Sequence, residues 1–171
     1  GASPDGSIHQ SEITRVHQAY GRNYQLPNTT AHNETCANIA NVMWCWRMFL
    51  LSGDGKYIDV LERTLYNSVL SGVSLTGTEY FYVNPLRVVD PMPTELRYPR
   101  SRQAFFTSFC CPPNLLRTIV EVNGLTYCVA KNSVWVNLYG SNVLTTRLDR
   151  QELKLEQKTE YPWNGVVQIE V

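Results

Sequence analysis

The spacing of apolar residues along the 171-residue chain changes once, and this change limits the folds that are open to it. Between residues 35 and 71, apolar side chains recur at three- and four-residue steps, the period of amphipathic helices. After residue 124 the period becomes two, with a turn about every eight to twelve residues, which is typical of a β-sandwich. Helices and strands are thus separated along the chain, and the sequence predicts an α+β protein with two domains.

Three helices are predicted in the first two-thirds of the chain, at residues 35–51, 57–71 and 114–122. Asn33 is the expected N-cap of the first of them. The polar turn at residues 52–55 stops that helix, so we expect the first two helices to pack as an antiparallel pair.

The remaining segments are predicted to be strands and loops. Residues 78–89 are expected to form one strand, and residues 90–104 an irregular loop. The strands expected after residue 124 are 125–130, 133–140, 142–148, 153–159 and 166–171.

Composition and charge exclude several classes of protein. Hydrophobic residues make up 43% of the chain, which fits a globular protein rather than a disordered one. The 15 basic residues balance the 15 acidic ones, so neither nucleic acid nor a membrane surface is an expected partner. No apolar stretch is long enough to span a membrane. The five cysteines cannot all pair within one chain, which favours reduced or metal-bound thiols.

Both ends of the sequence look cut. The chain starts with GASPDGS, without an initiator Met or a signal peptide, and it stops within the strand pattern of residues 166–171. We therefore expect a piece of a longer protein, and we favour a bacterial cytoplasmic or periplasmic location over an extracellular one. Apolar side chains that the missing part would cover are then expected to be exposed on the first two helices. They are Met43, Trp44, Trp46, Phe49 and Leu65.

One candidate site lies at the start of the first predicted helix, where Glu34 and Cys36 are two residues apart. On a regular helix these side chains would point to nearly opposite sides, so they can face one ion only if the backbone is not yet helical at Glu34. A helix N-terminus also favours a thiolate, because its dipole and free N–H groups stabilise negative charge. A helix-starting Glu beside a buried structural Cys is the alternative.

The second candidate site is the adjacent pair Cys110 and Cys111, which two prolines follow. Neighbouring cysteines seldom bond to each other, because the ring that they would close is strained. They can share a metal if the backbone kinks, and the two prolines predict an irregular path. With Glu34 and Cys36 they would complete a four-coordinate zinc site. Two buried structural cysteines are the alternative.

The other cysteines and the histidines are weaker candidates. Cys45 is predicted on the opposite helix face from Cys36, and Cys128 lies in a predicted strand, so both are expected in the core. His32 precedes Glu34 by two residues and is the histidine expected nearest the site. It could contact the site or the substrate, or it could lie in a surface loop.

Four stretches together resemble glycoside hydrolase family 127, the β-L-arabinofuranosidase type: YQLPNTTAHNETCANIANVMW, SGDGKYIDVLERTLYNSVLSGVS, EYFYVNPL and CCPPNLLRTI. The resemblance covers about residues 17–165, and the pairing of LPN…ETC with CCPPN is specific. It implies that residues 1–124 are the C-terminal portion of an (α/α)6-barrel catalytic domain. Residues 125–171 would be the first strands of a β-sandwich domain.

The resemblance also implies a zinc ion held by Glu34, Cys36, Cys110 and Cys111, with Cys110 as the nucleophile of a retaining mechanism. Zinc keeps a thiol deprotonated near neutral pH, and a thiolate can attack an anomeric carbon. The implied substrate is a β-L-arabinofuranoside or a related plant cell-wall sugar of the pectin type, with His32 as a candidate substrate-binding residue. A non-catalytic, zinc-stabilised carbohydrate-binding or scaffold module is the alternative.

One position departs from the family pattern. The family's general acid/base is a Glu sixteen residues before the Glu of ETC (34 − 16 = 18), where this chain has Gln18. Gln cannot donate and regain a proton, so another acid such as Glu12 or Glu79 would serve, or the leaving group needs less help, or this branch acts on a different sugar. The predicted helices are also too few for a complete barrel. We therefore expect the chain to be inactive alone, and to need the remainder of the enzyme or self-association.

Replacing Gln18 with Glu in the full-length enzyme is expected to change the pH dependence of kcat/KM, because it restores an ionisable group at the acid/base position. Rates measured from acid to neutral pH on an aryl β-L-arabinofuranoside would reveal this change. Gln18→Asn, which adds no ionisable group, is the control. Profiles of the same shape for Gln18→Glu and the unmodified enzyme would mean that proton transfer is handled elsewhere.

Overall fold

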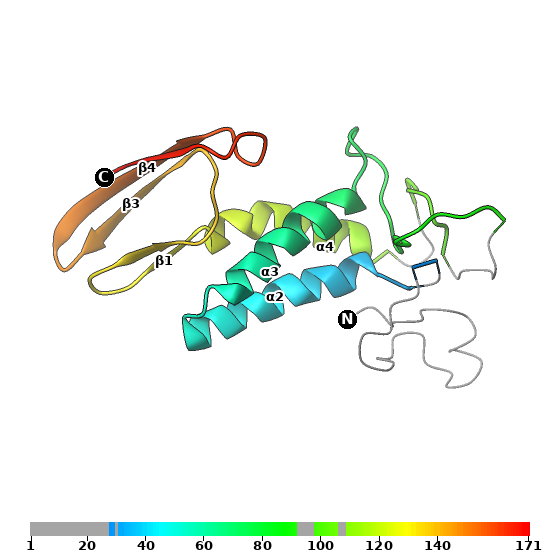
Figure 1. Ribbon diagram of the computed structural model, residues 1–171, viewed down its shortest axis with the longest axis horizontal. Coiled ribbons are helices and arrows are strands. Elements are labelled where there is room, and N and C mark those ends of the chain that lie inside the picture. Colours follow the sequence, from blue (N-terminus) through cyan, green and yellow to red (C-terminus); the bar gives the residue numbers. More distant parts are fainter. Residues whose placement is uncertain (1–27, 30, 92–97, 106–108) are drawn as a thin grey trace. The chain divides into compact units, whose positions relative to one another are not determined.

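The computed structural model of the chain describes residues 28–29, 31–91, 98–105 and 109–171 (Figure 1). The chain divides into two compact units, Gly1–Ile119 and Val120–Val171. The α-helices lie almost entirely in the first unit and the strands in the second, which confirms the predicted α+β composition. Within the described residues, each helix is too short or too polar to cross a membrane.

Two antiparallel helices dominate the first unit: α2 (Thr35–Ser52) and α3 (Lys56–Thr64), side by side in Figure 1. Asn41 of α2 donates a hydrogen bond to Thr64 of α3 at 3.3 Å, and the rings of Trp44 and Tyr57 meet edge to face. The predicted helix pair is thus confirmed. The buried side chains of α2 recur at every third or fourth position, the expected helical stripe: Thr35, Ile39, Val42, Cys45 and Phe49.

The ends of the two helices differ. Gly53 closes α2 in the left-handed conformation (φ 67°), and its N–H bonds to Phe49 O at 2.8 Å, a common form of helix C-cap. α3 instead continues into a π-helical turn at Leu65–Val69 and a 3-10 turn at Leu70–Gly72. The predicted helix at 57–71 is therefore right in extent, but its last turns are not α-helical.

The expected exposure of apolar side chains on this helix pair is confirmed only in part. Met43 and Trp44 are 47% and 55% exposed, and Trp46 is half-buried. The prediction is wrong for Phe49 and Leu65, which are 5% and 8% exposed. Both belong to the buried stripes of their helical segments, where burying such a side chain stabilises the fold by about 1.5–3 kcal/mol.

The predicted strand at residues 78–89 is wrong. Residues 80–84, which we call the central segment, instead form single bridges with separate parts of the chain. The bridged pairs are Glu34 with Val83, Val73 with Tyr80, and Tyr80 with Gln103. Each partner leaves after one pairing, and Pro85, which has no N–H, prevents a longer ladder.

The central segment anchors the start of α2. Thr35 donates its backbone N–H to Tyr82 O at 3.0 Å and its hydroxyl to Phe81 O at 2.8 Å. Asn33 donates its side-chain amide to Asn84 O at 2.7 Å. The first N–H groups of a helix have no partner within the helix, so these contacts satisfy one of them and fix the first turn in place.

The third helix, α4 (Cys111–Glu121), begins three residues earlier than predicted (114 − 111 = 3). Pro112 and Pro113 lie in its first turn, where a backbone N–H would have no helical partner, and their fixed φ suits the helix. The expectation that the two prolines impose an irregular path is therefore wrong.

Gly72 lets α4 and α2 approach each other. A Cβ atom at Gly72 would lie 2.7 Å from Leu115 Cδ1 of α4 and 3.2 Å from Thr35 Cγ2 of α2. Leu115 is fully buried, and the Thr35 hydroxyl is held by the central segment, so neither side chain can easily move away. Glycine at this position therefore permits the close packing of the two helices.

The second unit consists of two antiparallel sheets. β1 (Tyr127–Val129) pairs with β2 (Val134–Val136), and β4 (Gln151–Thr159) lies between β3 (Asn142–Leu148) and β5 (Val167–Glu170). Each strand overlaps with a predicted one. A 3-10 turn at Val122–Leu125 precedes them. The buried Gln157 of β4 donates to Tyr127 Oη of β1 at 2.7 Å, which ties the two sheets together.

Gly72→Ala is expected to lower the free energy of unfolding by about 1–3 kcal/mol, because the added methyl group overpacks the contact with Leu115 and Thr35. Gly55→Ala is the matched control. Gly55 has a helical φ of −57° and nothing within 4 Å of an added Cβ. That change is expected to be neutral or to stabilise by about 0.4–1 kcal/mol. Urea unfolding followed by circular dichroism measures both, and equal stability of the two variants would contradict this packing.

Candidate metal centre

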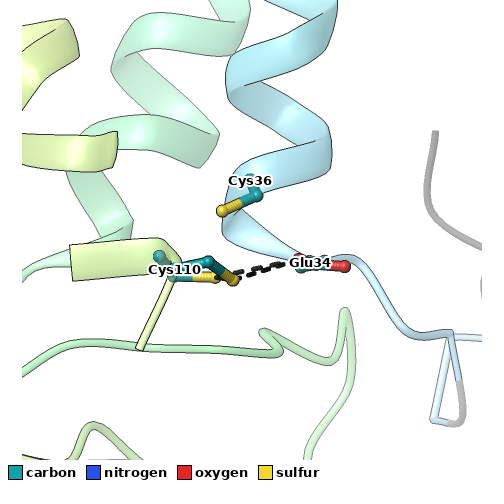
Figure 2. Close-up of side chains that lie close together, drawn as sticks. Glu34, Cys36 and Cys110 are labelled. Atoms are coloured by element: carbon teal, nitrogen blue, oxygen red, sulfur yellow. Dashed lines mark hydrogen bonds between the residues drawn. The ribbon is translucent and has the colours of Figure 1, made fainter. Parts of the chain in front are cut away.

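Four side chains from two distant motifs of the sequence meet where α2 and α4 begin: Glu34, Cys36, Cys110 and Cys111. One ligand atom from each, a carboxylate oxygen or a sulfur, lies within 4.8 Å of the others. Figure 2 shows Glu34 and Cys36 at the start of α2, with Cys110 facing them. The structure thus brings together the four residues that the two motifs indicate, and this cluster could bind a metal ion.

The backbone at Glu34 explains how its carboxylate and the Cys36 thiol reach the same place. Glu34 is extended (φ −68°, ψ 136°), and the helix starts only at Thr35. This confirms that the backbone is not yet helical at Glu34. The N-cap is therefore Glu34, and the prediction of Asn33 is wrong. Asn33 has a positive φ of 37°, which asparagine tolerates, and its side-chain oxygen accepts a hydrogen bond from Asn38 at 3.0 Å.

The three distances that join the ligand atoms of Glu34, Cys110 and Cys111 match the edges of a tetrahedral zinc site. Two sulfurs bound at about 2.3 Å to one ion, at the tetrahedral angle, lie roughly 3.8 Å apart. The Sγ atoms of Cys110 and Cys111 are 3.8 Å apart. Glu34 Oε1 lies 3.8 Å and 3.9 Å from these two sulfurs, near the roughly 3.6 Å expected between an oxygen and a sulfur ligand. The four donors therefore fit zinc in their chemistry, and Glu34, Cys110 and Cys111 also fit it in their spacing.

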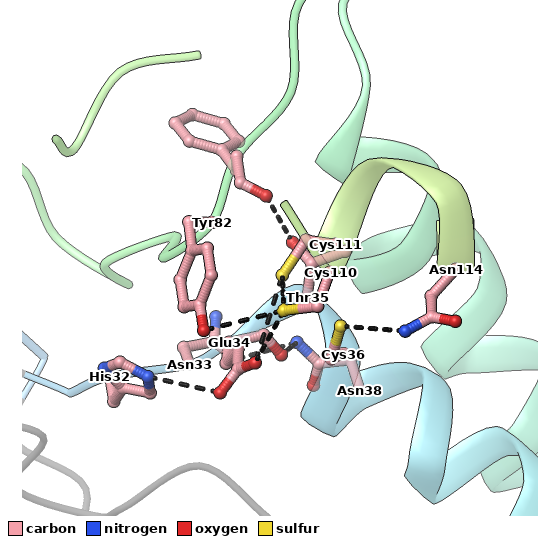
Figure 3. A network of polar contacts seen from close by, with 11 residues as sticks. His32, Asn33, Glu34, Thr35, Cys36, Asn38, Tyr82, Cys110, Cys111 and Asn114 are labelled. Atoms are coloured by element: carbon pink, nitrogen blue, oxygen red, sulfur yellow. Dashed lines mark hydrogen bonds and ion pairs between the residues drawn. The ribbon is translucent and has the colours of Figure 1, made fainter. Parts of the chain in front are cut away.

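Two helix N-termini, those of α2 and α4, lie at the cluster (Figure 3). Their N–H groups and dipoles favour negative charge and hence thiolates. The pKa of Cys36 falls to about 6, mainly through the hydrogen bond from Cys111, while burial opposes the shift and the Asn114 amide adds to it. The same hydrogen bond, together with burial, raises the pKa of Cys111. At neutral pH the cluster thus favours a Cys36 thiolate, the form that binds a metal.

The three sulfurs of the cluster differ in their access to solvent. Cys111 is fully buried, Cys36 is half-buried and Cys110 is exposed. Cys110 Sγ lies 3.6 Å from Tyr82 Oη, within hydrogen-bonding range for sulfur. Removal from water raises the pKa of Cys110, and the hydrogen bond with Tyr82 opposes this change. Among these three sulfurs, that of Cys110 is the one that an incoming molecule can reach most easily.

His32 lies beside the cluster rather than in a surface loop. Its Nε2 is 3.3 Å from Glu34 Oε2, whereas Glu34 Oε1 faces the sulfurs. The imidazole is only 5% exposed, and it lies next to the stacked rings of Tyr82 and Tyr98, whose centroids are 3.7 Å apart. His32 thus orients the carboxylate, and its role in substrate binding stays a prediction.

Sequence reasoning missed two residues at the cluster, Tyr82 and Asn114. Asn114 donates its Nδ2 to Cys36 Sγ at 3.3 Å. Its signal was present, because Asn114 belongs to the CCPPN motif and lies one helical turn after Cys111 once α4 is known to start there. Tyr82 belongs to the family stretch EYFYVNPL, but no periodicity indicates the bridges of the central segment that bring it to the cluster.

Other residues that the sequence singles out have different outcomes. Gln18 and Glu12 lie outside the described residues. Glu79 is exposed in a turn, where its carbonyl accepts a hydrogen bond from the N–H of Ser74. Cys45 is 1% exposed, which confirms its place in the core. Cys128 is only half-buried, so its predicted core position is confirmed in part.

Comparison with known proteins identifies similar chains. The family model described as the catalytic domain of GH127 β-L-arabinofuranosidases matches residues 6–124. A non-reducing end β-L-arabinofuranosidase of Bifidobacterium longum subsp. longum is 34% identical over 161 residues, 92% of this chain. A solved glycoside hydrolase structure is 50% identical over 99% of this chain, with a TM-score of 0.85. The structure of a GH127 β-L-arabinofuranosidase from Geobacillus stearothermophilus T6 is 44% identical over 84% of it, with a TM-score of 0.79. The chain spans 24%, 28% and 23% of these three proteins, about a quarter of their length.

Zinc is expected to protect Cys36 and Cys110 from alkylation. With a chelator present, iodoacetamide should modify these two residues well before the buried Cys45 and Cys111, because Cys36 favours the reactive thiolate and Cys110 is exposed. Added zinc should slow the modification of Cys36 and Cys110 several-fold but leave Cys128, which lies outside the cluster, unchanged. Peptide mass spectrometry over time gives the five rates. Rates at Cys36 and Cys110 that do not respond to zinc would show that the cluster does not hold the ion.

Proposed function

The chain belongs to the GH127 β-L-arabinofuranosidase family of glycoside hydrolases, and we propose that it supplies the metal centre and the nucleophile of a retaining glycosidase. The proposed substrate is a β-L-arabinofuranoside, because the relatives it matches are named β-L-arabinofuranosidases, or a related plant cell-wall sugar of the pectin type. The observation that carries this proposal is the cluster of Glu34, Cys36, Cys110 and Cys111, which offers one exposed sulfur in a site suited to zinc.

Zinc bound by Glu34, Cys36, Cys110 and Cys111 would keep the thiols deprotonated near neutral pH and so supply a thiolate for substitution. The four ligand atoms lie within 4.8 Å of one another, where a carboxylate and three thiolates repel strongly unless a cation offsets their charge. Cys36 and Cys111, the less accessible sulfurs, complete the site without meeting the substrate.

Cys110 is the proposed nucleophile because it is the most exposed of the three cysteines in the cluster. The sulfur attacks the anomeric carbon and forms a C–S bond, while the bond from that carbon to the leaving oxygen breaks and the oxygen takes up a proton. Water then attacks the same carbon, the sulfur leaves as a thiolate, and the water loses a proton. Two successive substitutions at one carbon retain its configuration.

Tyr82 and His32 support this chemistry. Burial raises the pKa of Tyr82 above its usual range and keeps the hydroxyl protonated, so it can donate a hydrogen bond to a Cys110 thiolate. This bond would favour departure of the sulfur in the second substitution. His32 holds Glu34 Oε2 and leaves Oε1 directed at the sulfurs.

The chain has no proton donor at the position of the family's general acid/base, because Gln18 replaces the Glu there. We propose that another acid such as Glu12 serves, or that the sugar and its leaving group need less protonation. The same position favours the alternative function, a non-catalytic carbohydrate-binding or scaffold module. In that case zinc would be structural and Cys110 inert.

We further propose that residues 1–124 are the C-terminal part of an (α/α)6 barrel and residues 125–171 the first strands of a β-sandwich. The helices of such a barrel pack against neighbours, and apolar side chains exposed on α2 and α4 support this assignment: Met43, Trp44, Leu116 and Ile119. The rest of a longer protein, or self-association, would cover them and complete the sugar pocket. The chain alone is therefore expected to be inactive.

In the full-length enzyme, Cys110→Ser is expected to lower kcat by at least about a thousandfold, because serine is a poor zinc ligand and a much weaker nucleophile at neutral pH. Cys45→Ser is the matched control, since it makes the same chemical change in the core. There the new hydroxyl can bond to the backbone carbonyl of Asn41, one turn earlier in α2. Turnover of an aryl β-L-arabinofuranoside and zinc content by elemental analysis are measured for both variants and the unmodified enzyme.

The two measurements test separate parts of the proposal. The unmodified enzyme is expected to keep one zinc per chain after dialysis against a weak chelator, and a folded protein without metal would contradict the zinc centre. Equal turnover by the two variants would exclude Cys110 as the nucleophile. A zinc-bound protein whose Cys110 does not react with a sugar-like electrophile would favour the non-catalytic module.

A further inference from the structure

Asn114, in the first turn of α4, places its side-chain amide against the sulfur of Cys36. Its Nδ2 lies 3.3 Å from Cys36 Sγ, well within the range for an N–H donor and a sulfur acceptor. Figure 3 shows the amide nitrogen of Asn114 pointing at this sulfur. Because Cys36 belongs to α2, the hydrogen bond joins the two helices whose first turns form the cluster.

The orientation of this amide is fixed by Arg117, which lies three residues further along α4. Arg117 Nη1 is 2.9 Å from Asn114 Oδ1. A guanidinium group only donates hydrogen bonds, so the atom that it faces is the amide oxygen, and the amide nitrogen must face the sulfur. Asn114 is therefore the donor and Cys36 the acceptor, and a charged thiolate is the strongest form of that acceptor.

We propose that Asn114 is a positioning residue of the metal centre: its amide N–H holds the Cys36 sulfur in place as a zinc ligand, and Arg117 holds the amide. This inference rests on the proposed zinc site and extends it beyond the four ligands. Partners of this kind orient a ligand and share its charge, and their loss typically weakens metal binding by about 10–100-fold.

The neighbours of the three sulfurs explain why Cys36 needs such a donor. Cys110 has the Tyr82 hydroxyl at 3.6 Å, and Cys111 is fully enclosed by the protein. Cys36 is only half-buried at the start of α2, so its side chain has room to turn away from the other ligands. An N–H group directed at the sulfur stabilises the position in which it faces the cluster.

The contacts that hold Asn114 in α4 do not involve its side-chain amide. Its backbone N–H bonds to Cys110 O at 3.3 Å, and its carbonyl accepts the hydroxyl of Thr118 at 2.8 Å. A change of the side chain leaves both bonds intact. Metal binding can therefore be altered without removing the contacts that shape the helix.

Asn114→Asp in the full-length protein tests the proposal. Aspartate has nearly the same shape and still accepts from Arg117, but it replaces the N–H by an oxygen that repels a thiolate. We expect the zinc affinity, measured by competition with a chromophoric chelator, to fall by about 10–100-fold. In the Co²⁺-substituted protein, the thiolate-to-metal charge-transfer bands should shift, because the charge on one sulfur changes.

Two further variants make the result specific. Asn67→Asp is the matched control: it changes an exposed amide that bonds only to a backbone carbonyl, that of Arg63 at 3.0 Å, among the contacts described for it. It should leave both readouts unchanged. Arg117→Leu changes an exposed side chain and frees the amide to rotate, so it should weaken zinc binding in the same direction but by less than Asn114→Asp.

Unchanged zinc affinity and cobalt spectra in both Asn114→Asp and Arg117→Leu would overturn the proposal. If the unmodified protein binds no zinc, the proposed metal centre itself fails, and the role of Asn114 fails with it. Circular dichroism of the metal-free proteins shows whether the variants fold. Should Asn114→Asp not fold, Arg117→Leu decides: weaker zinc binding supports the proposal, and unchanged binding overturns it.

Discussion

The first turns of α2 and α4 face one another around a carboxylate and three sulfurs, and much of the first unit holds these two helix ends together. Thr35 is bonded to the central segment, and Gly72 leaves space for Leu115. Each helix N-terminus offers N–H groups without helical partners and roughly half a positive charge. Two such ends offset only a part of the repulsion among groups that can carry four negative charges. Shared protons or a divalent cation must offset the rest of this repulsion. The close packing of the two helix ends therefore depends on what neutralises the charges between them.

The cluster of Glu34, Cys36, Cys110 and Cys111 could be predicted because it consists of residue types that stand out in the sequence, a Glu and three Cys in two short motifs that a family resemblance pairs. Apolar periodicity likewise located the helix pair and the strands, because helix and strand periods are local properties. It failed for Asn33 and for residues 78–89. The amide of Asn33 bonds to Asn84 instead of capping α2, and the central segment pairs with separate stretches, one bridge at a time. These hydrogen bonds and bridges depend on which residues, distant in the sequence, lie close together in the fold. A pattern of apolar residues does not contain that information.

Because apolar periodicity does not identify distant partners, the predicted exposure of apolar side chains on the helices was only partly right. A helical period shows which residues share a face, but it does not show which face this chain covers by itself. Phe49 and Leu65 were expected to be open and are buried, whereas Met43 and Trp44 are exposed. Exposed aromatic and aliphatic side chains grouped on a helix favour a further surface that packs against them. Because the chain spans about a quarter of its relatives, the remainder of a longer protein is the simplest source of that surface.

A thiolate that is both a metal ligand and a nucleophile must be held in place and also be accessible to the substrate. In the proposed site, Cys36 and Cys111 are held in place, and Cys110 is accessible. Cys111 is fully enclosed, and Cys36 lies within α2 with the amide of Asn114 against it. Cys110 immediately precedes α4, where its carbonyl accepts the N–H of Asn114, and its side chain is exposed beside the Tyr82 hydroxyl. While the Cys110 sulfur is bonded to the sugar, Glu34, Cys36 and Cys111 would remain to hold the ion. Three protein ligands are the number that catalytic zinc sites commonly keep. In the proposed mechanism, the unequal burial of otherwise similar thiols would let Cys110 react while the less accessible residues of the cluster stay in place.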